Sequence, residues 1–367
     1  MPLPVFDVVD GAADGEVTSA RNRAAFDDVT WVHRAARAVG NPRLGTSILG
    51  ESFALPVVLA PCGLVGSVRP AAEPAVFRAA ARAGVPAVSS TCATASLERI
   101  AREGGAGDKW FQLYFLGGRK GAEALVDRAA DAGYRTLVVT VDTPVSGHRE
   151  RDSRHGVSLP VDFGIRNVAR VAPHVIGRPG WLWRLARDRR SIEMGNLSQG
   201  DRTGLGSLFE EPPTWRDLDW IRRRWNGPLV VKGLMSADDA RTAVECGADA
   251  VVVSNHGGRQ LDGLPASLDA LPAVVAAVGD HAEVYVDGGV RRGSDVAKAL
   301  ALGARAVLIG RAYLYGLAAA GEPGVDRVLE IFAEELRRTL VLLGCDGVDE
   351  LGPGVFGNDV PVRSGRC

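Results

Sequence analysis

Residues 251–263, VVVSNHGGRQLDG, join an apolar run directly to a turn that carries a histidine, two glycines and an arginine. The run is β-branched and has no polar residue before Ser254, which is typical of a strand buried on both faces. Gly257 and Gly258 have no side chains, so the turn can approach a ligand closely. The segment predicts a buried strand whose end presents His256 and Arg259 to a site.

The same pattern recurs along the whole chain. Ala-rich stretches of helical period separate short β-branched runs, and several of these stretches end in a glycine suited to a helix C-cap. Strands that alternate with helices imply parallel pairing, and eight such units predict an α/β fold of the closed (β/α)8 TIM-barrel type. The stretch 322–344 is expected to be the final barrel helix with an extension. The eight runs are 57–60, 86–89, 110–115, 137–141, 228–232, 250–254, 283–287 and 305–309.

Residues 1–367 are expected to form one domain, with a long insertion at residues 145–227 between the fourth and fifth predicted strands. Loops of this length usually have a function of their own. The stretch 178–190, RPGWLWRLARDRR, is basic and aromatic. It fits an oligomer contact, a lid over the active site, or a helix lying on a membrane surface.

Composition excludes several classes of function. Lys and Arg total 43 against 44 Asp and Glu, so there is no basic excess for nucleic acid. The five cysteines are scattered, without CxxC or metal spacing, which indicates reduced thiols. The N-terminal residues do not resemble a signal peptide, and no apolar run is long enough to span a membrane. We therefore expect a cytoplasmic protein without a metal site.

The predicted strand ends carry the side chains that could perform chemistry. In such barrels, active-site residues lie at the C-terminal ends of the strands, so these side chains should converge on one mouth. A barrel that binds a phosphorylated ligand without redox chemistry is the alternative from another class. The residues at the ends are Pro61, Cys62 and Gly63; Ser90; Gln112 and Tyr114; Thr140 and Asp142; Lys232; His256 and Arg259; Asp287, Gly289 and Arg291; Gly310 and Arg311.

The last two strand ends predict a phosphate site, because their glycines free backbone N–H groups and Arg291 and Arg311 add positive charge. A single phosphate indicates a mononucleotide cofactor. Polar side chains on the second to fourth strands could bond a flat polar ring. Lys232 could then neutralise negative charge that develops on that ring, as a reduced flavin requires.

The run at 251–263, together with VKG (231–233) and VDGGVRRGSDVAKALALGARAVLIGR (286–311), resembles the FMN-dependent α-hydroxy acid oxidase and dehydrogenase family. That family includes glycolate oxidase, lactate oxidase and mandelate dehydrogenase. FQLY (111–114), TVDTP (140–144) and HRERD (148–152) match as well, and the resemblance spans roughly residues 6–345.

The resemblance implies that the protein oxidises a 2-hydroxy acid to the 2-oxo acid. His256 would be the base, and Asp142 would stabilise its charged form. Arg259 and Arg149 would hold the substrate carboxylate, and Tyr114 would hydrogen-bond the substrate. Hydride would pass to flavin N5, with a carbanion route as the alternative. The electron acceptor would be O2 or a quinone or carrier, and the protein would be a homotetramer.

The resemblance also assigns the FMN contacts. The ring would lie against Pro61, Cys62, Gly63, Ser90, Gln112 and Thr140, with Lys232 at its N1 edge. Asp287 would bind the ribityl chain. The phosphate would be held by Gly289, Arg291, Gly310 and Arg311.

Two departures from the family pattern concern substrate choice. Val8 stands where the family usually has a pocket tyrosine, and Cys92 where it often has an aromatic residue. Both changes predict a larger, less polar pocket and a bulky or aromatic substrate.

Three stretches also resemble the flavoprotein branch of mycofactocin maturation, namely 178–186, 271–280 and 310–325. An α-amino or peptide-derived substrate is therefore the alternative. Because Arg259 and Arg149 are present, the sequence favours the 2-hydroxy acid.

Overall fold

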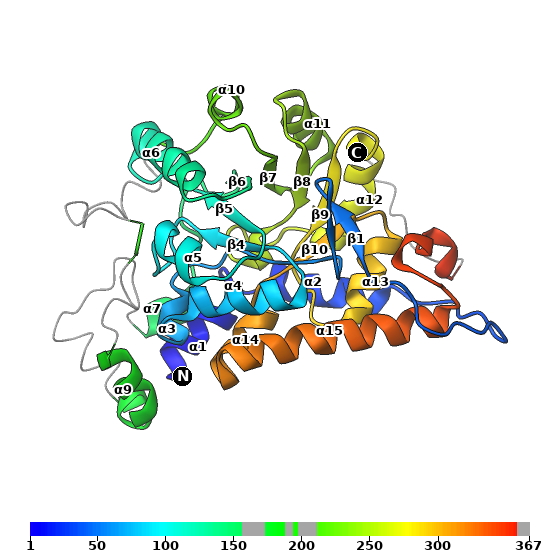
Figure 1. Ribbon diagram of the computed structural model, residues 1–367, viewed down its shortest axis with the longest axis horizontal. Coiled ribbons are helices and arrows are strands. Elements are labelled where there is room, and N and C mark those ends of the chain that lie inside the picture. The colour runs from blue at the N-terminus through cyan, green and yellow to red at the C-terminus, as the bar shows by residue number, and fades with distance from the viewer. Residues whose placement is uncertain (156–172, 188–193, 197–210, 358–367) are drawn as a thin grey trace.

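The computed structural model describes residues 1–155, 173–187, 194–196 and 211–357. Within them, eight parallel strands close into a barrel in the order β10-β3-β4-β5-β6-β7-β8-β9, which confirms the predicted TIM barrel (Figure 1). The strands are β3 (Val57–Leu59), β4 (Ala87–Ser90), β5 (Lys109–Leu113), β6 (Thr136–Thr140), β7 (Leu229–Leu234), β8 (Ala250–Val253), β9 (Glu283–Val286) and β10 (Ala306–Ile309).

Every predicted run overlaps an observed strand, and no end differs by more than two residues. β5 stops at Leu113, so Tyr114 follows the strand and is not part of it. β7 continues to Leu234, which places Lys232 inside the strand, and its pairing with β8 shifts between these two residues. The hydrogen bonds between neighbouring strands decide where each strand ends, and the composition of a run does not reveal this pairing.

The barrel interior is filled by side chains from alternating strand positions, among them Val58, Trp110, Val138 and Tyr285. The antiparallel hairpin of β1 (Thr46–Ile48) and β2 (Glu51–Phe53) adds Ile48 to this inner core. The backbone N–H of Leu49 also donates to Glu283, the first residue of β9. The hairpin therefore closes the N-terminal end of the barrel and leaves the opposite end for the site.

The helices that follow the strands pack on the outside of the barrel and bury a second, larger apolar core. The short helix α14 directly follows β10. α15 comes next as a long helix along the outside of the barrel (Figure 1), and it packs on α14, on α13, which follows β9, and on α4, which precedes β4. The stretch 322–344 thus takes the expected place of the final barrel helix. The outer helices are α3 (Val65–Val68), α4 (Ala72–Ala83), α5 (Leu97–Glu103), α6 (Gly118–Asp131), α10 (Trp215–Arg224), α11 (Ala237–Glu245), α12 (Ser267–Val278), α13 (Gly293–Ala301), α14 (Arg311–Ala320) and α15 (Glu322–Leu343).

Two segments outside the regular repeat lie near the barrel mouth. α1 (Leu3–Asp10) and α2 (Val17–Asp28) precede the first hairpin. The insertion after β6 contains α7 (Glu150–Arg154) and α9 (Pro179–Arg187), while 156–172, 188–193 and 197–210 of it lie outside the described residues. Short 3-10 turns η3 (His256–Gly258), η4 (Val348–Glu350) and η5 (Pro353–Val355) complete the elements.

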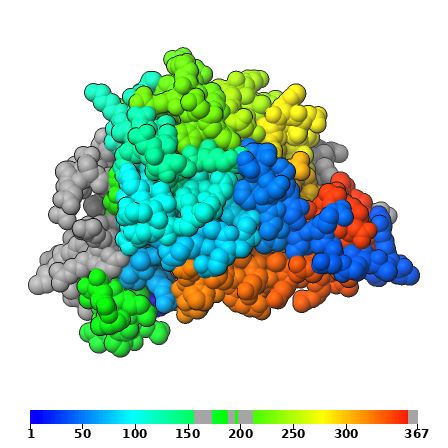
Figure 2. All heavy atoms as spheres, in the orientation of Figure 1, coloured from blue at the N-terminus to red at the C-terminus, as the bar shows by residue number. Residues whose placement is uncertain are grey.

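α9 is the part of the predicted basic and aromatic stretch that the structure describes. Trp181 is buried, and its indole N–H donates to the carbonyl of Ser67 in α3, 3.0 Å away. Trp183 on the same helix is 60% exposed, and α9 projects from the body of the molecule (Figure 2). None of the described helices combines the length and the apolar character needed to cross a bilayer.

Candidate active site

The turn after β8 has a backbone that most residues avoid. His256, Gly257 and Gly258 have φ of 57°, 63° and 77°, in the left-handed region. Glycine is needed at 258, because a Cβ there would lie 2.7 Å from the backbone nitrogen of Ser19. The His256 N–H donates to the Ser254 hydroxyl at 3.0 Å, which helps to hold the turn. Strained residues of this kind cluster at functional sites.

His256 pairs with Asp142 as the sequence predicted. Its Nδ1 lies 3.0 Å and 3.1 Å from the two carboxylate oxygens of Asp142, and its Nε2 lies 3.4 Å from the Tyr114 hydroxyl. Burial opposes ionisation of Asp142, but His256 and Lys232 outweigh it, so the pKa of Asp142 is below its ordinary value. The carboxylate therefore accepts from Nδ1–H and leaves Nε2 as the proton-accepting atom.

Two guanidinium groups lie near the imidazole. Arg259 donates from Nη1 to the carbonyl of Gly11 at 2.6 Å, and Arg149 donates to Ser146 at 3.3 Å. Burial, together with Arg149 and Arg311, lowers the pKa of Arg259 to about 9. Asp152 raises the pKa of Arg259 in the opposite direction, and its Oδ2 lies 3.7 Å from Nε of Arg149. This cluster has an excess of positive charge that a bound carboxylate would neutralise.

A cavity of about 960 Å³, which includes space open to solvent, occupies the barrel mouth. Eleven predicted site residues line it, namely Pro61, Cys62, Gly63, Lys232, His256, Arg259, Asp287, Gly289, Arg291, Gly310 and Arg311. The other six, Ser90, Gln112, Tyr114, Thr140, Asp142 and Arg149, are outside the lining of this cavity. Their roles and those of the lining residues stay predictions.

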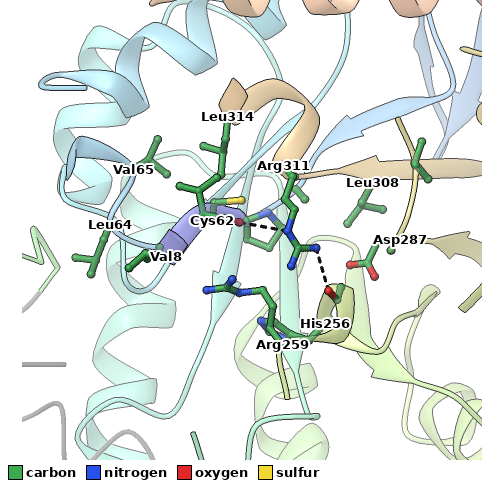
Figure 3. Close-up of a pocket in the computed structure, with 18 of the residues that line it drawn as sticks. Val8, Cys62, Leu64, Val65, His256, Arg259, Asp287, Leu308, Arg311 and Leu314 are labelled. Carbon is green, nitrogen blue, oxygen red and sulfur yellow. Dashed lines mark hydrogen bonds between the residues drawn. The ribbon is translucent and has the colours of Figure 1, made fainter. Parts of the chain in front are cut away.

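One end of this cavity is lined by apolar side chains. Val8, Leu64, Val65 and Leu314 gather there, and Asp287 lies at the other end beside Leu308 (Figure 3). Val8 therefore lines the cavity, where a tyrosine would have added a hydroxyl. Cys92 lies behind the lining, because a Cβ on Gly63 would be 3.1 Å from its Cβ.

Buried polar atoms at the mouth fit a flavin. Within the described residues, Nε2 of Gln112, Oγ1 of Thr140 and Oδ1 of Asp287 are buried without a hydrogen-bond partner. Such atoms are costly unless a ligand or water satisfies them. A flat polar ring and a hydroxylated chain would supply those partners.

Lys232 supplies the cation that a flavin site needs. Its Nζ bonds Asp287 at 3.0 Å and Ser254 at 2.9 Å. Burial favours the neutral amine, but Asp287 and Asp142 outweigh it and raise the pKa of Lys232. The ammonium is therefore charged at the barrel mouth.

The guanidinium groups of the two arginines predicted to bind phosphate differ in how many hydrogen bonds they make within the protein. Arg311 donates to three backbone carbonyls, at 3.2 Å to Val9, 2.9 Å to Gly11 and 2.9 Å to Gly257. Figure 3 draws hydrogen bonds of the Arg311 guanidinium as dashed lines. Arg311 thus joins α1 to the His256 turn. Arg291 donates one nitrogen to Val290, and its guanidinium carbon lies 5.8 Å from the ring centroid of Tyr315.

The sequence missed two polar residues that support these turns. Asn22 and Arg23 come from α2, far along the chain from the strand ends, and bond the turns after β8 and β9. A helix position carries no signal for such contacts, because they depend on how α2 packs on the barrel.

A planar cofactor held beside a histidine base is an arrangement of barrel oxidoreductases that use a flavin. Residues 1–358 match the sequence model of the FMN-dependent dehydrogenases. The chain belongs to that family, so it is an oxidoreductase and its cofactor is FMN.

Known relatives cover nearly the whole chain. An L-lactate dehydrogenase of Caulobacter sp. (strain K31) is 42% identical and aligns over 97% of this chain and 94% of its own length. A pre-mycofactocin synthase of Mycobacterium tuberculosis is also 42% identical and aligns over 100% of this chain and 92% of its own. The crystal structure of the monotopic membrane protein (S)-mandelate dehydrogenase matches with a TM-score of 0.92 at 38% identity, covering 98% and 96% of the two chains.

Proposed function

We propose that this protein oxidises a 2-hydroxy acid with a bulky apolar or aromatic side chain to the 2-oxo acid. The observation that carries the proposal is the placement of the His256–Asp142 pair beside the guanidinium groups of Arg259 and Arg149. The substrate hydroxyl can lose its proton to His256 while the two guanidinium groups hold the neighbouring carboxylate. The relatives that act on lactate and mandelate support this substrate class.

The residues divide the work by charge. His256 Nε2 receives the proton that the substrate loses, and the Asp142 carboxylate stabilises the imidazolium. Burial, with Asp142 nearby, raises the pKa of Tyr114 well above its ordinary value, so its hydroxyl stays protonated and can donate a hydrogen bond. The residues described above would hold FMN, which would supply the acceptor for the two electrons.

The cavity shape supports a large side chain. Val8, Leu64 and Val65 offer no hydrogen bond at their end of the cavity. A short substrate such as glycolate would leave this apolar surface wet, whereas a phenyl ring would cover it.

A panel of matched compounds tests the proposal. The purified protein is mixed without oxygen with 2-hydroxy acids of increasing side-chain size, and with the amide of each acid. The flavin absorption is expected to bleach with large acids faster than with lactate, and much more slowly with the neutral amides. Equal bleaching by acid and amide would contradict the role of the two arginines.

The second candidate is oxidation of an α-amino or peptide-derived substrate in a mycofactocin-like pathway. The pre-mycofactocin synthase that aligns over the whole chain favours it. Flavin reduction by an α-amino amide, with none by any 2-hydroxy acid, would select this candidate instead.

We also propose that the protein works in the cytoplasm as a homotetramer, docked on the membrane through α9. Trp183 is 60% and Leu182 38% exposed, and Arg184 and Arg187 lie in the last turn of the helix. Apolar and basic residues together suit an anionic bilayer surface, where a quinone acceptor is available. The structural neighbour described as a monotopic membrane protein supports this docking.

Sedimentation with lipid vesicles tests the docking. Anionic vesicles are expected to carry down the protein and zwitterionic ones much less, and Trp183→Ala should weaken the binding.

Two further measurements test the oligomeric state and the electron acceptor. Light scattering of the protein without vesicles measures the size of the oligomer. A comparison of flavin reoxidation by O2 and by a quinone identifies the acceptor.

A further inference from the structure

Asn22 on α2 is buried, with 2% of its surface exposed, and faces Asn255, the residue before His256. The two side-chain amides bond each other in both directions, with each Nδ2 2.8 Å from the other Oδ1. The Oδ1 of Asn22 also accepts from the N–H of Ser267 at 3.1 Å. The side chain of Asn22, which comes from outside the barrel, thus donates to and accepts from the segment that carries His256.

Asn255, which Asn22 holds in place, is in turn bonded to the turn around His256. Its Oδ1 accepts from the N–H of Gly258 at 3.2 Å, and its Nδ2 donates to the carbonyl of Pro265 at 3.0 Å. His256 lies between these anchored points, and its φ of 57° is unfavourable for a residue with a Cβ. The amide pair therefore helps to keep the imidazole directed at Asp142.

Arg23, the next residue on α2, holds the turn after β9. Its Nη1 lies 2.7 Å from the carbonyl of Gly289 and 2.6 Å from Oδ2 of Asp295. That carboxylate oxygen also accepts from the backbone N–H groups of Arg291 and Arg292, at 2.8 Å and 3.1 Å. Arg23 thus fixes the backbone that presents Arg291.

We propose that Asn22 is a positioning residue for His256, and that Arg23 is a positioning residue for the FMN-phosphate turn. The proposal rests on His256 acting as the base in the proposed function. Because the two side chains hold different turns, their effects separate. Loss of the Asn22 amide slows proton removal, and loss of the Arg23 fork weakens FMN retention.

The requirement at position 22 is for an amide. Asn22→Asp has the same size and keeps the oxygen that accepts from Asn255 Nδ2 and Ser267 N–H. It loses the N–H that donates to Asn255 Oδ1 and places a second oxygen there instead. The amide pair does not tolerate this change, because two oxygens that both accept hydrogen bonds would then face each other.

The experiment compares Asn22→Asp, Asn22→Ala and Arg23→Lys with the unchanged holoenzyme. Asp27→Asn is the control, because it removes an exposed ion pair of Arg23, 2.9 Å long, on the same helix. Three quantities are measured for each protein: the FMN dissociation constant, the rate of flavin reduction at saturating 2-hydroxy acid, and the conformation of residue 256 in a crystal structure.

Both Asn22 variants are expected to reduce their flavin about 100-fold more slowly, since a displacement near 1 Å costs about that much. Their FMN dissociation constants should change less than about threefold, and residue 256 should leave the left-handed region. Arg23→Lys should raise the FMN dissociation constant about tenfold or more, because a lysine cannot reproduce the fork. Its reduction rate, once FMN is saturating, should stay near that of the unchanged protein.

The proposal would be overturned if the Asn22 and Arg23 variants changed the FMN dissociation constant and the reduction rate together. α2 would then have only a general stabilising role. An Asn22→Asp variant with normal reduction and an unmoved residue 256 would also overturn it. If no 2-hydroxy acid reduces the unchanged protein, the proposed function fails, while the FMN constants and the crystal structures still decide the role of α2.

Discussion

His256 keeps a φ of 57°, which costs about 1–3 kcal/mol for a residue with a Cβ. The surrounding bonds from Ser254 and Asp142 offset that cost and aim Nε2 into the barrel mouth. Arg259 is the second unusual residue, because it is half-buried close to the other cations Arg149 and Arg311. The backbone of His256 directs a base into the site, and the position of Arg259 near other cations favours the binding of an anion.

Arg259→Lys is expected to raise KM for a 2-hydroxy acid by about tenfold or more, with a smaller change in kcat. A lysine keeps the charge but loses the planar fork that grips a carboxylate with two bonds. Steady-state kinetics measures both constants. Arg34→Lys, at an exposed arginine, is the control, and a KM unchanged in Arg259→Lys would contradict carboxylate binding at this position.

Cys92 and Cys62 are expected to resist alkylation. Burial raises the pKa of Cys92 to about 12, and burial also raises that of Cys62 despite nearby cations. A raised pKa means that the reactive thiolate forms only at strongly alkaline pH. Iodoacetamide at mildly alkaline pH should label both only after unfolding, as peptide mass spectrometry would show. Rapid labelling of Cys92 in the folded protein would contradict this.

At the level of elements, the loops after the strands are held together by α1 and α2. The carbonyl of Gly11, just after α1, accepts from both Arg259 and Arg311. α2 bonds the turns after β8 and β9 through Asn22 and Arg23. Two short N-terminal helices thus connect loops that no strand pairing links.

Gly258→Ala is expected to destabilise the protein and slow flavin reduction. A Cβ at this position combines a φ of 77° with a contact of 2.7 Å to Ser19 N on α2. Gly263→Ala is the matched control, since its φ is 87° but a Cβ there meets nothing within 4 Å. Melting temperature and reduction rate should both fall further in Gly258→Ala. Equal effects of the two changes would show that α2 does not constrain the turn.

At the scale of the whole molecule, the sequence predicted the barrel because short buried runs, most of them rich in valine, alternate with stretches of helical period. It also indicated the strand-end residues, since closure of a barrel brings all eight ends to one mouth. Neither the role of Asn22 nor the three carbonyl contacts of Arg311 could be predicted. Both depend on the packing of α1 and α2, which no periodicity in the sequence encodes.

Removal of FMN is expected to lower the melting temperature by several degrees. A ligand present at about 1,000 times its dissociation constant stabilises by about 4 kcal/mol, and Gln112, Thr140 and Asp287 lose hydrogen-bond partners without it. Calorimetry of the holoprotein, the apoprotein and the reloaded protein measures this. Riboflavin, which lacks the phosphate, should restore less of the loss. Full recovery with an equal concentration of riboflavin would contradict the phosphate site.

The most direct measurement follows the flavin band of the protein, and of His256→Ala, after mixing with an aromatic 2-hydroxy acid without oxygen. We expect both proteins to be yellow, the unchanged protein to bleach, and His256→Ala to bleach at least about 100-fold more slowly, as the loss of a general base predicts. Bleaching of the alanine variant at the rate of the unchanged protein would contradict the central claim that His256 is the base of this site.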